Sequence, residues 1–248
     1  MTSLINYVYF HVYRMDDGYL LEGKYDKAHR GKLMAEDKLV IGPLRLRCHE
    51  ASNKNMPYDE RYTGYIEKLG LLPWIQLVSR STMNMNPSAI SALIDRWRPE
   101  THSFHLRTGE MTVTLQDASM ITALPIDGAP VCFITDSKDW CSCMISLIGK
   151  APEPKEDSSS DRLSAGATYK WIREHFAKCP VGANQETIEQ YARAYVWYVI
   201  TRTLFADSDG RNAPWMWLKA LSGKKLSWGS GALAYLYRQV IIITHIFS

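Results

Sequence analysis

The stretch "IDRWRPETHSFHLRTGEMTVTLQDASMITALPIDGAP" (residues 94–130) decides the fold class, because its hydrophobic period changes within it. Up to Trp97 the apolar residues recur at helical spacing. From Phe104 onward they alternate with polar residues on either side of Gly109, which can turn the chain. Alternation around a glycine predicts a β-hairpin. One small hairpin near residues 104–115 is therefore expected between helices.

The residues after this hairpin predict a helix. Thr114 and Asp117 stand three positions apart, as in a capping box, at the start of "LQDASMITAL" (115–124). Pro125 ends this helix, because a proline inside a helix removes a backbone hydrogen bond. The chain is thus expected to pass from strand to helix at about residue 115.

The residues before the hairpin predict a helix with clear boundaries. Asn86 can cap its start, and Pro87 suits the first helical turn. Pro99 closes it. Its apolar face has the spacing i, i+3, i+4 and i+7 and consists of Ile90, Leu93, Ile94 and Trp97.

Helical periodicity also covers most of the remaining chain, and no internal repeat is evident. The predicted segments are residues 58–69, 71–80, 139–148, 169–176, 184–205, 214–221 and 227–243. The sequence therefore predicts a mainly α fold: a single multi-helical domain of about eight helices with one small β-hairpin.

The domain organisation follows from where this periodicity begins and breaks. Residues 1–57 form a poorly defined lead-in, and residues 58–248 form the helical domain. Residues 150–166 are rich in proline, serine and charge, so we expect a mobile loop there. The end "VIIITHIFS" (240–248) has no polar tail, and we expect a truncation at this C-terminus.

Composition indicates a folded intracellular protein. Of 248 residues, 46% are apolar and 22% charged, which excludes wholesale disorder. The net charge of +3 is too small to indicate a nucleic-acid partner by itself. Five cysteines without a CxxC pair and the absence of a glycosylation sequon favour a reducing compartment over secretion. The longest apolar run is far shorter than a membrane span, so no membrane partner is expected.

Two histidines in the opening stretch are the first candidates for metal binding. His102 and His105 lie near Asp95, Glu100 and Glu110. Residues three apart on a strand point to opposite faces, whereas zinc needs three or four converging ligands. A structural or hydrogen-bonding role is therefore favoured, and a cryptic metal-dependent enzyme is the less favoured alternative. Cys141 and Cys143 diverge on a helix and are interpreted as buried free thiols.

The same stretch is the candidate partner or nucleic-acid contact. Arg96, Arg98 and Arg107 could bind phosphate, and His102 and His105 lie among them. The alternative is structural, because Trp97 belongs to the apolar face and arginines beside carboxylates usually pair with them. Both interpretations stay open.

No catalytic signature appears elsewhere. We find no GxGxxG, no Walker-type loop, no HExxH and no GxSxG. Five lysines lie in or beside polar loops rather than in an apolar pocket that would suit a Schiff base, namely Lys150, Lys155, Lys219, Lys224 and Lys225. The sequence therefore assigns no catalytic residue, no cofactor and no metal.

The order of several motifs together resembles the plant mobile domain family, also labelled aminotransferase-like. These motifs are "GLLPWIQLV" (70–78), "ALIDRWRPETHSFHL" (92–106), "GEMTVTLQDASMITALPIDGAPV" (109–131), "YARAYVWYVI" (191–200), "WMWLKAL" (215–221) and "SWGSGALAYLYRQV" (227–240). The resemblance spans about residues 58–240.

This resemblance implies a domain of plant transposable elements and of host genes derived from them. It implies a nuclear, or nuclear and cytoplasmic, factor of the kind linked to transposon silencing, genome integrity and meristem maintenance. It further implies nuclear protein partners, among them a serine/threonine phosphatase of the long-form type, with DNA or RNA contact as the alternative. The aminotransferase label carries no weight here, because no pyridoxal-phosphate site is found, and a non-enzymatic interaction module is expected.

Overall fold

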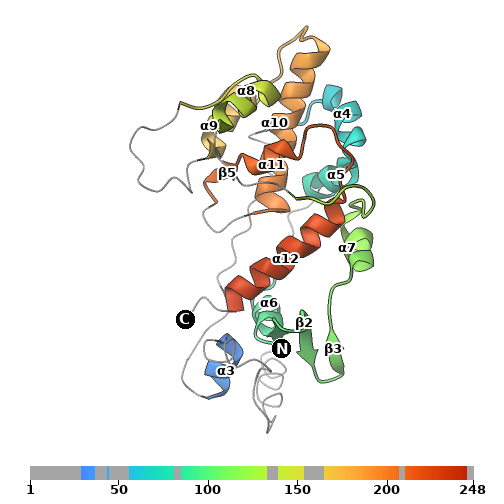
Figure 1. Ribbon diagram of the computed structural model, residues 1–248, viewed down its shortest axis with the longest axis vertical. Coiled ribbons are helices and arrows are strands. Elements are labelled where there is room, and N and C mark those ends of the chain that lie inside the picture. Colours follow the sequence, from blue (N-terminus) through green and yellow to red (C-terminus); the bar gives the residue numbers. More distant parts are fainter. Residues whose placement is uncertain are drawn as a thin grey trace. The chain divides into compact units, whose positions relative to one another are not determined.

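The computed structural model describes residues 29–36, 44, 56–80, 85–132, 139–153, 165–206 and 210–244. These residues contain ten α-helices and two small antiparallel sheets, so the predicted mainly α class is confirmed (Figure 1). The chain divides into two compact units. The sheet unit comprises residues 1–47, 84–114 and 234–248, and the helical unit comprises residues 48–83 and 115–233.

The sheet unit is built around three short antiparallel strands in the order β1-β2-β3. Its elements are α3 (Arg30–Ala35), α6 (Pro87–Ile94), β1 (Trp97–Arg98), β2 (Ser103–Leu106), β3 (Gly109–Met111) and the second half of α12 (Trp228–Thr244). The predicted start of α6 is confirmed: the Asn86 side chain accepts a hydrogen bond from the Ala89 amide at 3.1 Å, and Pro87 follows it.

The core of the sheet unit corrects one prediction. Trp97 was expected on the apolar face of α6, but α6 ends at Ile94 and Trp97 lies in β1, fully buried. Pro99 disfavours helical geometry at Arg98, and Trp97 pairs with Phe104 in the sheet instead. Leu93, expected beside Trp97, is 43% exposed instead.

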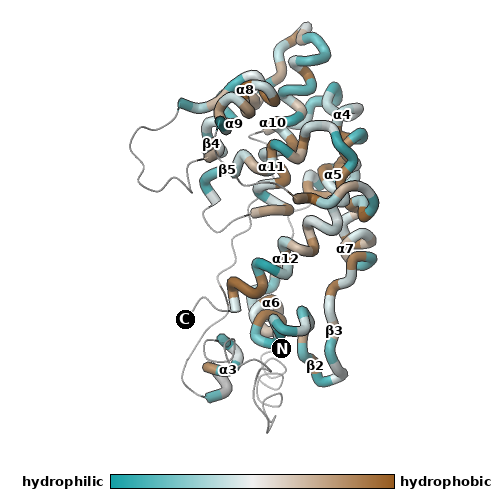
Figure 2. Tube along the Cα trace, viewed as in Figure 1, coloured by the Kyte–Doolittle hydropathy of each residue, from teal (hydrophilic) through white to brown (hydrophobic). Residues whose placement is uncertain are grey.

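Trp97 nevertheless organises the core of this unit. Its ring lies 4.9 Å from that of Phe104 and 5.3 Å from that of Tyr237, measured between centroids. Ile94 and Val240 complete the buried cluster. Figure 2 shows the apolar C-terminal end of α12, in brown, which supplies Val240.

The predicted hairpin is confirmed, but its second strand is shorter than expected. Residue pairs run from Phe104 opposite Met111 to Leu106 opposite Gly109, whose φ of +122° favours glycine. Beyond Met111 the backbone leaves the sheet because its polar groups bond elsewhere. The Tyr237 hydroxyl donates to the carbonyl of Val113 at 2.6 Å.

The helical unit surrounds α10 (Gln185–Thr203). Asn184 caps this helix as predicted and accepts a hydrogen bond from the Thr187 amide at 2.8 Å. Residues 194–201 are buried without interruption, which marks a central helix covered on all sides. Helices and strands around it are η1 (Glu60–Tyr62), α4 (Thr63–Lys68), α5 (Leu72–Arg80), α8 (Trp140–Ile148), α9 (Tyr169–Phe176), β5 (Asn212–Pro214) and α11 (Met216–Lys219). β4 (Gly166–Thr168) pairs with β5, and α7 (Leu115–Thr122) packs on α5.

Large aromatic residues join these elements by their polar ends. The Trp228 indole donates to the Leu69 carbonyl at 2.8 Å, and the Trp197 indole donates to the Pro214 carbonyl at 2.9 Å. The Tyr169 hydroxyl donates to the Thr201 carbonyl at 2.9 Å. Each of these three rings thus buries its apolar body while its N–H or O–H is satisfied.

Some predictions lie partly outside the described residues. The loop predicted over residues 150–166 includes residues 154–164, and the chain end includes residues 245–248, neither of which is described. The boundary between residues 57 and 58 stays a prediction. No helix among the described residues is long and apolar enough to cross a membrane. Among the described residues, Cys141 and Cys143 are free thiols as predicted, but they are partly rather than fully covered, so the interpretation as buried thiols is only partly correct.

Candidate functional site

The three-stranded sheet sorts the residues of the opening stretch onto two faces. Trp97 pairs with Phe104, and both pack into the core of the sheet unit. Arg98 pairs with Ser103, and successive side chains of a strand alternate between faces. Arg98, Ser103 and His105 therefore share the other face, here called the polar face. Glu110 lies opposite His105 and joins them.

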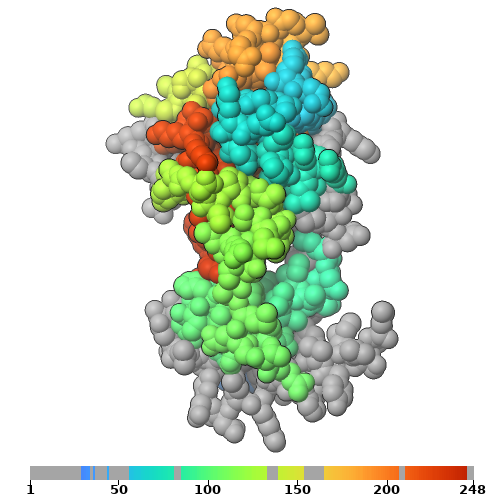
Figure 3. Space-filling model, turned by 90° about the vertical axis from the view of Figure 1, so that its right-hand side faces the viewer, coloured from blue at the N-terminus to red at the C-terminus, as the bar shows by residue number. Residues whose placement is uncertain are grey.

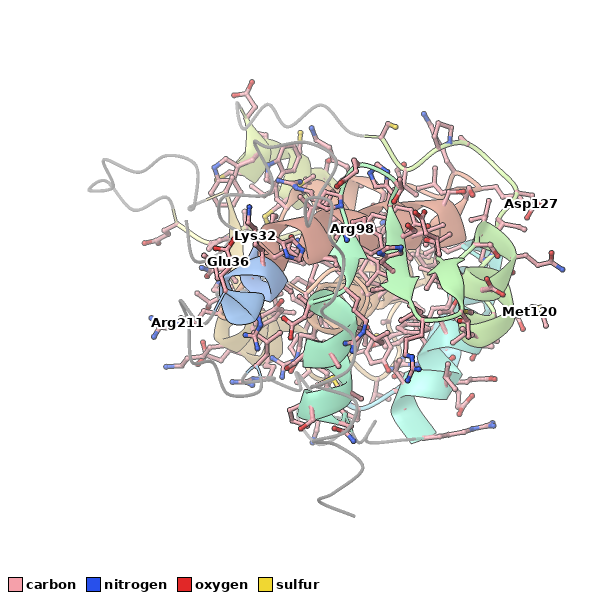
Figure 4. All side chains as sticks on the ribbon, turned by 90° about the horizontal axis from the view of Figure 1, so that it is seen from below. Lys32, Glu36, Arg98, Met120, Asp127 and Arg211 are labelled. Carbon is pink, nitrogen blue, oxygen red and sulfur yellow. The ribbon has the colours of Figure 1, made fainter. Side chains whose placement is uncertain are left out.

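Side chains of the polar face bond to one another. The Arg98 guanidinium lies 3.3 Å from the Nδ1 atom of His105. The Ser103 hydroxyl donates to a carboxylate oxygen of Glu110 at 2.9 Å and lies 2.7 Å from the Thr101 hydroxyl. The face therefore carries both a guanidinium, from Arg98, and a carboxylate, from Glu110. Figure 4 labels Arg98.

His102 belongs to the aromatic side instead. Its ring lies 6.3 Å from that of Trp97 and 5.5 Å from that of Tyr237. Its φ of +51° is a left-handed conformation, and its carbonyl accepts a hydrogen bond from the Thr112 hydroxyl at 2.6 Å. The two histidines therefore contact different partners, as expected from residues three apart near a strand. His102 supports the packing of Trp97 and Tyr237.

The other two arginines of the candidate set lie at the margins of the sheet. The Arg96 guanidinium donates to the Ala92 carbonyl at 2.6 Å and so closes the end of α6. Arg107 is exposed in the turn between β2 and β3. The structure thus brings Arg98 and His105 into contact and leaves Arg107 on the surface. A contact of these residues with a partner stays a prediction.

The described residues include no group of three or more His, Cys, Asp or Glu side chains placed to hold a metal ion. Side chains of the disfavoured metal candidate lie in different contacts. His105 bonds to Arg98, Glu110 accepts from Ser103, and His102 packs on aromatic rings.

Asp95 takes part in a buried ion pair that the sequence did not predict. Its carboxylate accepts a hydrogen bond from Arg30 Nε at 2.6 Å, and each side chain is only 1% exposed. Burial raises the pKa of Asp95, whereas the guanidinium of Arg30 opposes this shift. Next to it, His29 accepts from the Gly31 amide at Nδ1, so its Nε2 carries the proton toward the Trp97 carbonyl, 3.0 Å away. These contacts attach α3 to the sheet unit.

The helical unit also carries exposed apolar side chains on α7 and just after it, which sequence reasoning missed. Met120 and Ile121 on α7 are 77% and 71% exposed, and Ile126 follows the helix with 41% exposed. Figure 3 shows this side of the molecule, with α7 in light green beside α5, and Figure 4 labels Met120. We call these three residues the α7 ridge. The sequence of α7 indicated exposed apolar residues, because its apolar side chains lie on two faces of the helix. Ala118 is the one buried residue of this helix.

Two similarities identify the family. A family model described as "Plant mobile domain" matches residues 72–245, well over half of the chain. The chain belongs to the plant mobile domain family. Protein MAINTENANCE OF MERISTEMS of Arabidopsis thaliana is 37% identical over 202 residues, which cover 79% of this chain and 40% of that protein. The resemblance inferred from the motif order is therefore confirmed.

Two other relatives match this chain over a similar number of residues. Protein MAIN-LIKE 2 of Arabidopsis thaliana is 34% identical over 201 residues, 78% of this chain and 28% of that protein. A protein named serine/threonine-protein phosphatase 7 long form homolog, from the same plant, is 31% identical over 216 residues, 86% of this chain and 15% of that protein. The chain spans less than half the length of these relatives. No solved structure matches.

Proposed function

We propose that this plant mobile domain is a non-enzymatic interaction module of the nucleus, derived from a transposon. The observation that carries the proposal is the α7 ridge. Large apolar side chains at this level of exposure mark interaction surfaces when they occur together. The best catalytic candidates of the sequence, His102, His105 and Glu110, serve instead in contacts that hold the sheet unit together.

The partner class is proposed from the relatives. One relative is named for meristem maintenance and another is named as a long-form phosphatase homolog. The second match covers only 15% of that protein, so the shared part is a domain within a larger chain. We therefore propose that the domain associates with nuclear proteins, including a long-form phosphatase, in transposon silencing, genome integrity and meristem maintenance.

The test is affinity purification of the tagged 248-residue chain from plant nuclei, followed by quantitative mass spectrometry. The expected result is enrichment of chromatin, phosphatase or transposon-related proteins over a tag-only control. Recovery of none of these classes would contradict the proposal. Localisation of the tagged chain outside the nucleus in all cells would contradict its nuclear part.

A second candidate function is nucleic-acid binding within a transposition machinery. The contact between Arg98 and His105 on the polar face, with Arg107 exposed nearby, favours it. Binding that depends on phosphate contacts weakens steeply as salt rises. Gel shifts with mixed-sequence DNA and RNA at low ionic strength test it, since the absence of salt-sensitive binding rejects this function.

A matched pair of variants makes that assay specific. Replacement of the arginines 96, 98 and 107 by glutamine should abolish the shift if they form the contact. Replacement of Lys170, Lys178 and Lys224 by glutamine removes the same charge from exposed positions in the helical unit and should leave it unchanged. Equal losses in both variants would show non-specific charge attraction.

A further inference from the structure

The helix α3 begins beside a histidine whose two ring nitrogens both contact the backbone. His29 directly precedes α3 and is 0% exposed. Its Nδ1 atom accepts a hydrogen bond from the Gly31 amide at 3.1 Å, as the side chain of an N-cap residue does. Its Nε2 atom lies 3.0 Å from the carbonyl oxygen of Trp97. The ring therefore joins the start of α3 to strand β1.

These two contacts fit one protonation state of the His29 ring. A backbone amide can only donate, so Nδ1 carries a lone pair, and a carbonyl can only accept, so Nε2 carries the hydrogen. The ring is thus a neutral imidazole. A protonated imidazolium has an N–H at both positions and no acceptor. A proton gained at Nδ1 would set two N–H groups against each other and break the cap.

The charges around His29 also disfavour a protonated ring. The next residue, Arg30, is a buried guanidinium, and the N-terminal end of a helix carries a partial positive charge. Other described charges lie on α3, directly after α6 and on β1. These charged residues are Arg30, Lys32, Glu36, Asp95, Arg96 and Arg98. The two carboxylates among them are each paired with a cation, Asp95 with Arg30 and Glu36 with Lys32.

The attachment of α3 depends on contacts at its first turn. The helix has six residues, and a helix this short is not stable by itself in water. His29 supplies both the cap and the bond to β1, and Arg30 supplies the buried ion pair with Asp95. Protonation of His29 would remove the cap and place a second cation beside Arg30 in a buried site. Both effects weaken the same attachment.

We infer that His29 is a pH-sensitive latch: the neutral ring holds α3 on the sheet unit, and the protonated ring releases it. The attached state binds the extra proton less readily than the released state, in which water surrounds the ring. The stabilisation by the latch is therefore present above about pH 6.5, where a histidine in water is neutral, and is lost as pH falls below that value. Release takes His29 and Arg30 away from β1 and Asp95, so it changes the surface that the sheet unit presents.

The first experiment measures hydrogen–deuterium exchange of the 248-residue chain by mass spectrometry between about pH 7.5 and pH 5.5. Rates are corrected for the intrinsic pH dependence of amide exchange. We expect the protection of the α3 amides to fall about tenfold for each pH unit below about 6.5, because one proton is taken up on release. The amides of α10 should keep their protection. Unchanged protection of α3, or an equal loss in α10 through global unfolding, would overturn the inference.

The second experiment follows the ring itself in the unaltered chain by NMR with ¹⁵N-labelled histidine. At about pH 7.5 the His29 ring should carry its hydrogen on Nε2, and its protonation should coincide with the loss of α3 protection. The His29→Asn variant assigns the signal, because only the His29 resonances disappear. Protonation of His29 with α3 still protected, or release of α3 with His29 still neutral, would contradict the latch.

A matched pair of variants assigns the pH dependence to His29. Asparagine at position 29 can cap α3 through its side-chain oxygen and does not titrate, so His29→Asn should keep α3 protected at low pH. His175→Asn changes a partly buried histidine on α9 in the helical unit and should leave the pH response of α3 unaltered. The same pH response in His29→Asn as in the unaltered chain would place the switch on another group and overturn the inference.

Discussion

Removal of one member of the buried Arg30–Asp95 pair should destabilise the sheet unit far more than removal of both. The Nε atom of Arg30 lies 2.6 Å from the carboxylate of Asp95, and each side chain is 1% exposed. The variants are Arg30→Met, Asp95→Leu and the double substitution. Each single variant removes one charged member of this buried pair, whereas the double variant places apolar groups of similar size in the site.

The expected magnitudes follow from this burial. Loss of one partner from a buried ion pair costs about 3–5 kcal/mol, while replacement of the whole pair by apolar residues is often nearly neutral. The two single losses would add to about 6–10 kcal/mol if they were independent. We expect the double variant to lose much less, so that the coupling energy between the two sites is on the order of 3 kcal/mol.

The pH dependence has a definite sign. Burial raises the pKa of Asp95 above its unfolded value, so the folded state binds this proton more tightly than the unfolded state. Between the unfolded and folded pKa values, stability from this group therefore increases as pH falls. Arg30→Met removes the guanidinium that opposes the shift, so the pKa of Asp95 rises further. The loss in Arg30→Met should shrink as pH is lowered toward the raised pKa of Asp95, and no such trend should occur in the double variant.

The assay is urea unfolding of the four proteins at pH 5, 6 and 7, followed by tryptophan fluorescence. Trp97 is one of the eight tryptophans that contribute to this signal, and it lies in the core of the sheet unit that contains Asp95. Additive losses would refute the coupling between the two charges. A loss in Arg30→Met that is the same at every pH would refute the assignment of the effect to a buried carboxylate.

Five further substitutions, two of them controls, test other parts of the structure by thermal unfolding. Trp97→Ala should cost about 3–5 kcal/mol and Leu93→Ala less than about 0.5 kcal/mol; equal losses would contradict the placement of Trp97 in a strand core and of Leu93 on the surface. Asn184→Ala should cost about 1 kcal/mol through loss of the α10 cap, and no change would mean that the cap bond is unimportant. Gly128→Ala should cost about 1–3 kcal/mol, because φ is +116° and a Cβ atom would lie 2.8 Å from a backbone oxygen. Gly64→Ala meets no atom within 4 Å, so it should be neutral or stabilising and serves as its control.

Local signals in the sequence determined most helix boundaries of this protein. Asn86 and Asn184 cap α6 and α10 as predicted, and α7 begins directly after Thr114. The hairpin around Gly109 was predicted as well, since alternation and a turn residue lie within a few positions of each other. Caps, turns and periodicity depend on residues that are near neighbours in the chain, so they can be predicted from the sequence alone. The motif order also sufficed to recognise the family.

Contacts between distant residues were decided only by the tertiary structure. Arg30 and Asp95 are 65 positions apart, and nothing in either local sequence predicts their buried pairing. The α7 ridge is exposed because a helix with apolar residues on two faces can bury only one against its neighbour, and α5 packs on the other. The candidate site was also decided by tertiary structure. The register of the three-stranded sheet placed Arg98 beside His105, and His102 packs among aromatic rings. The sequence therefore sets which elements form, whereas packing sets which of their faces remain available to a partner.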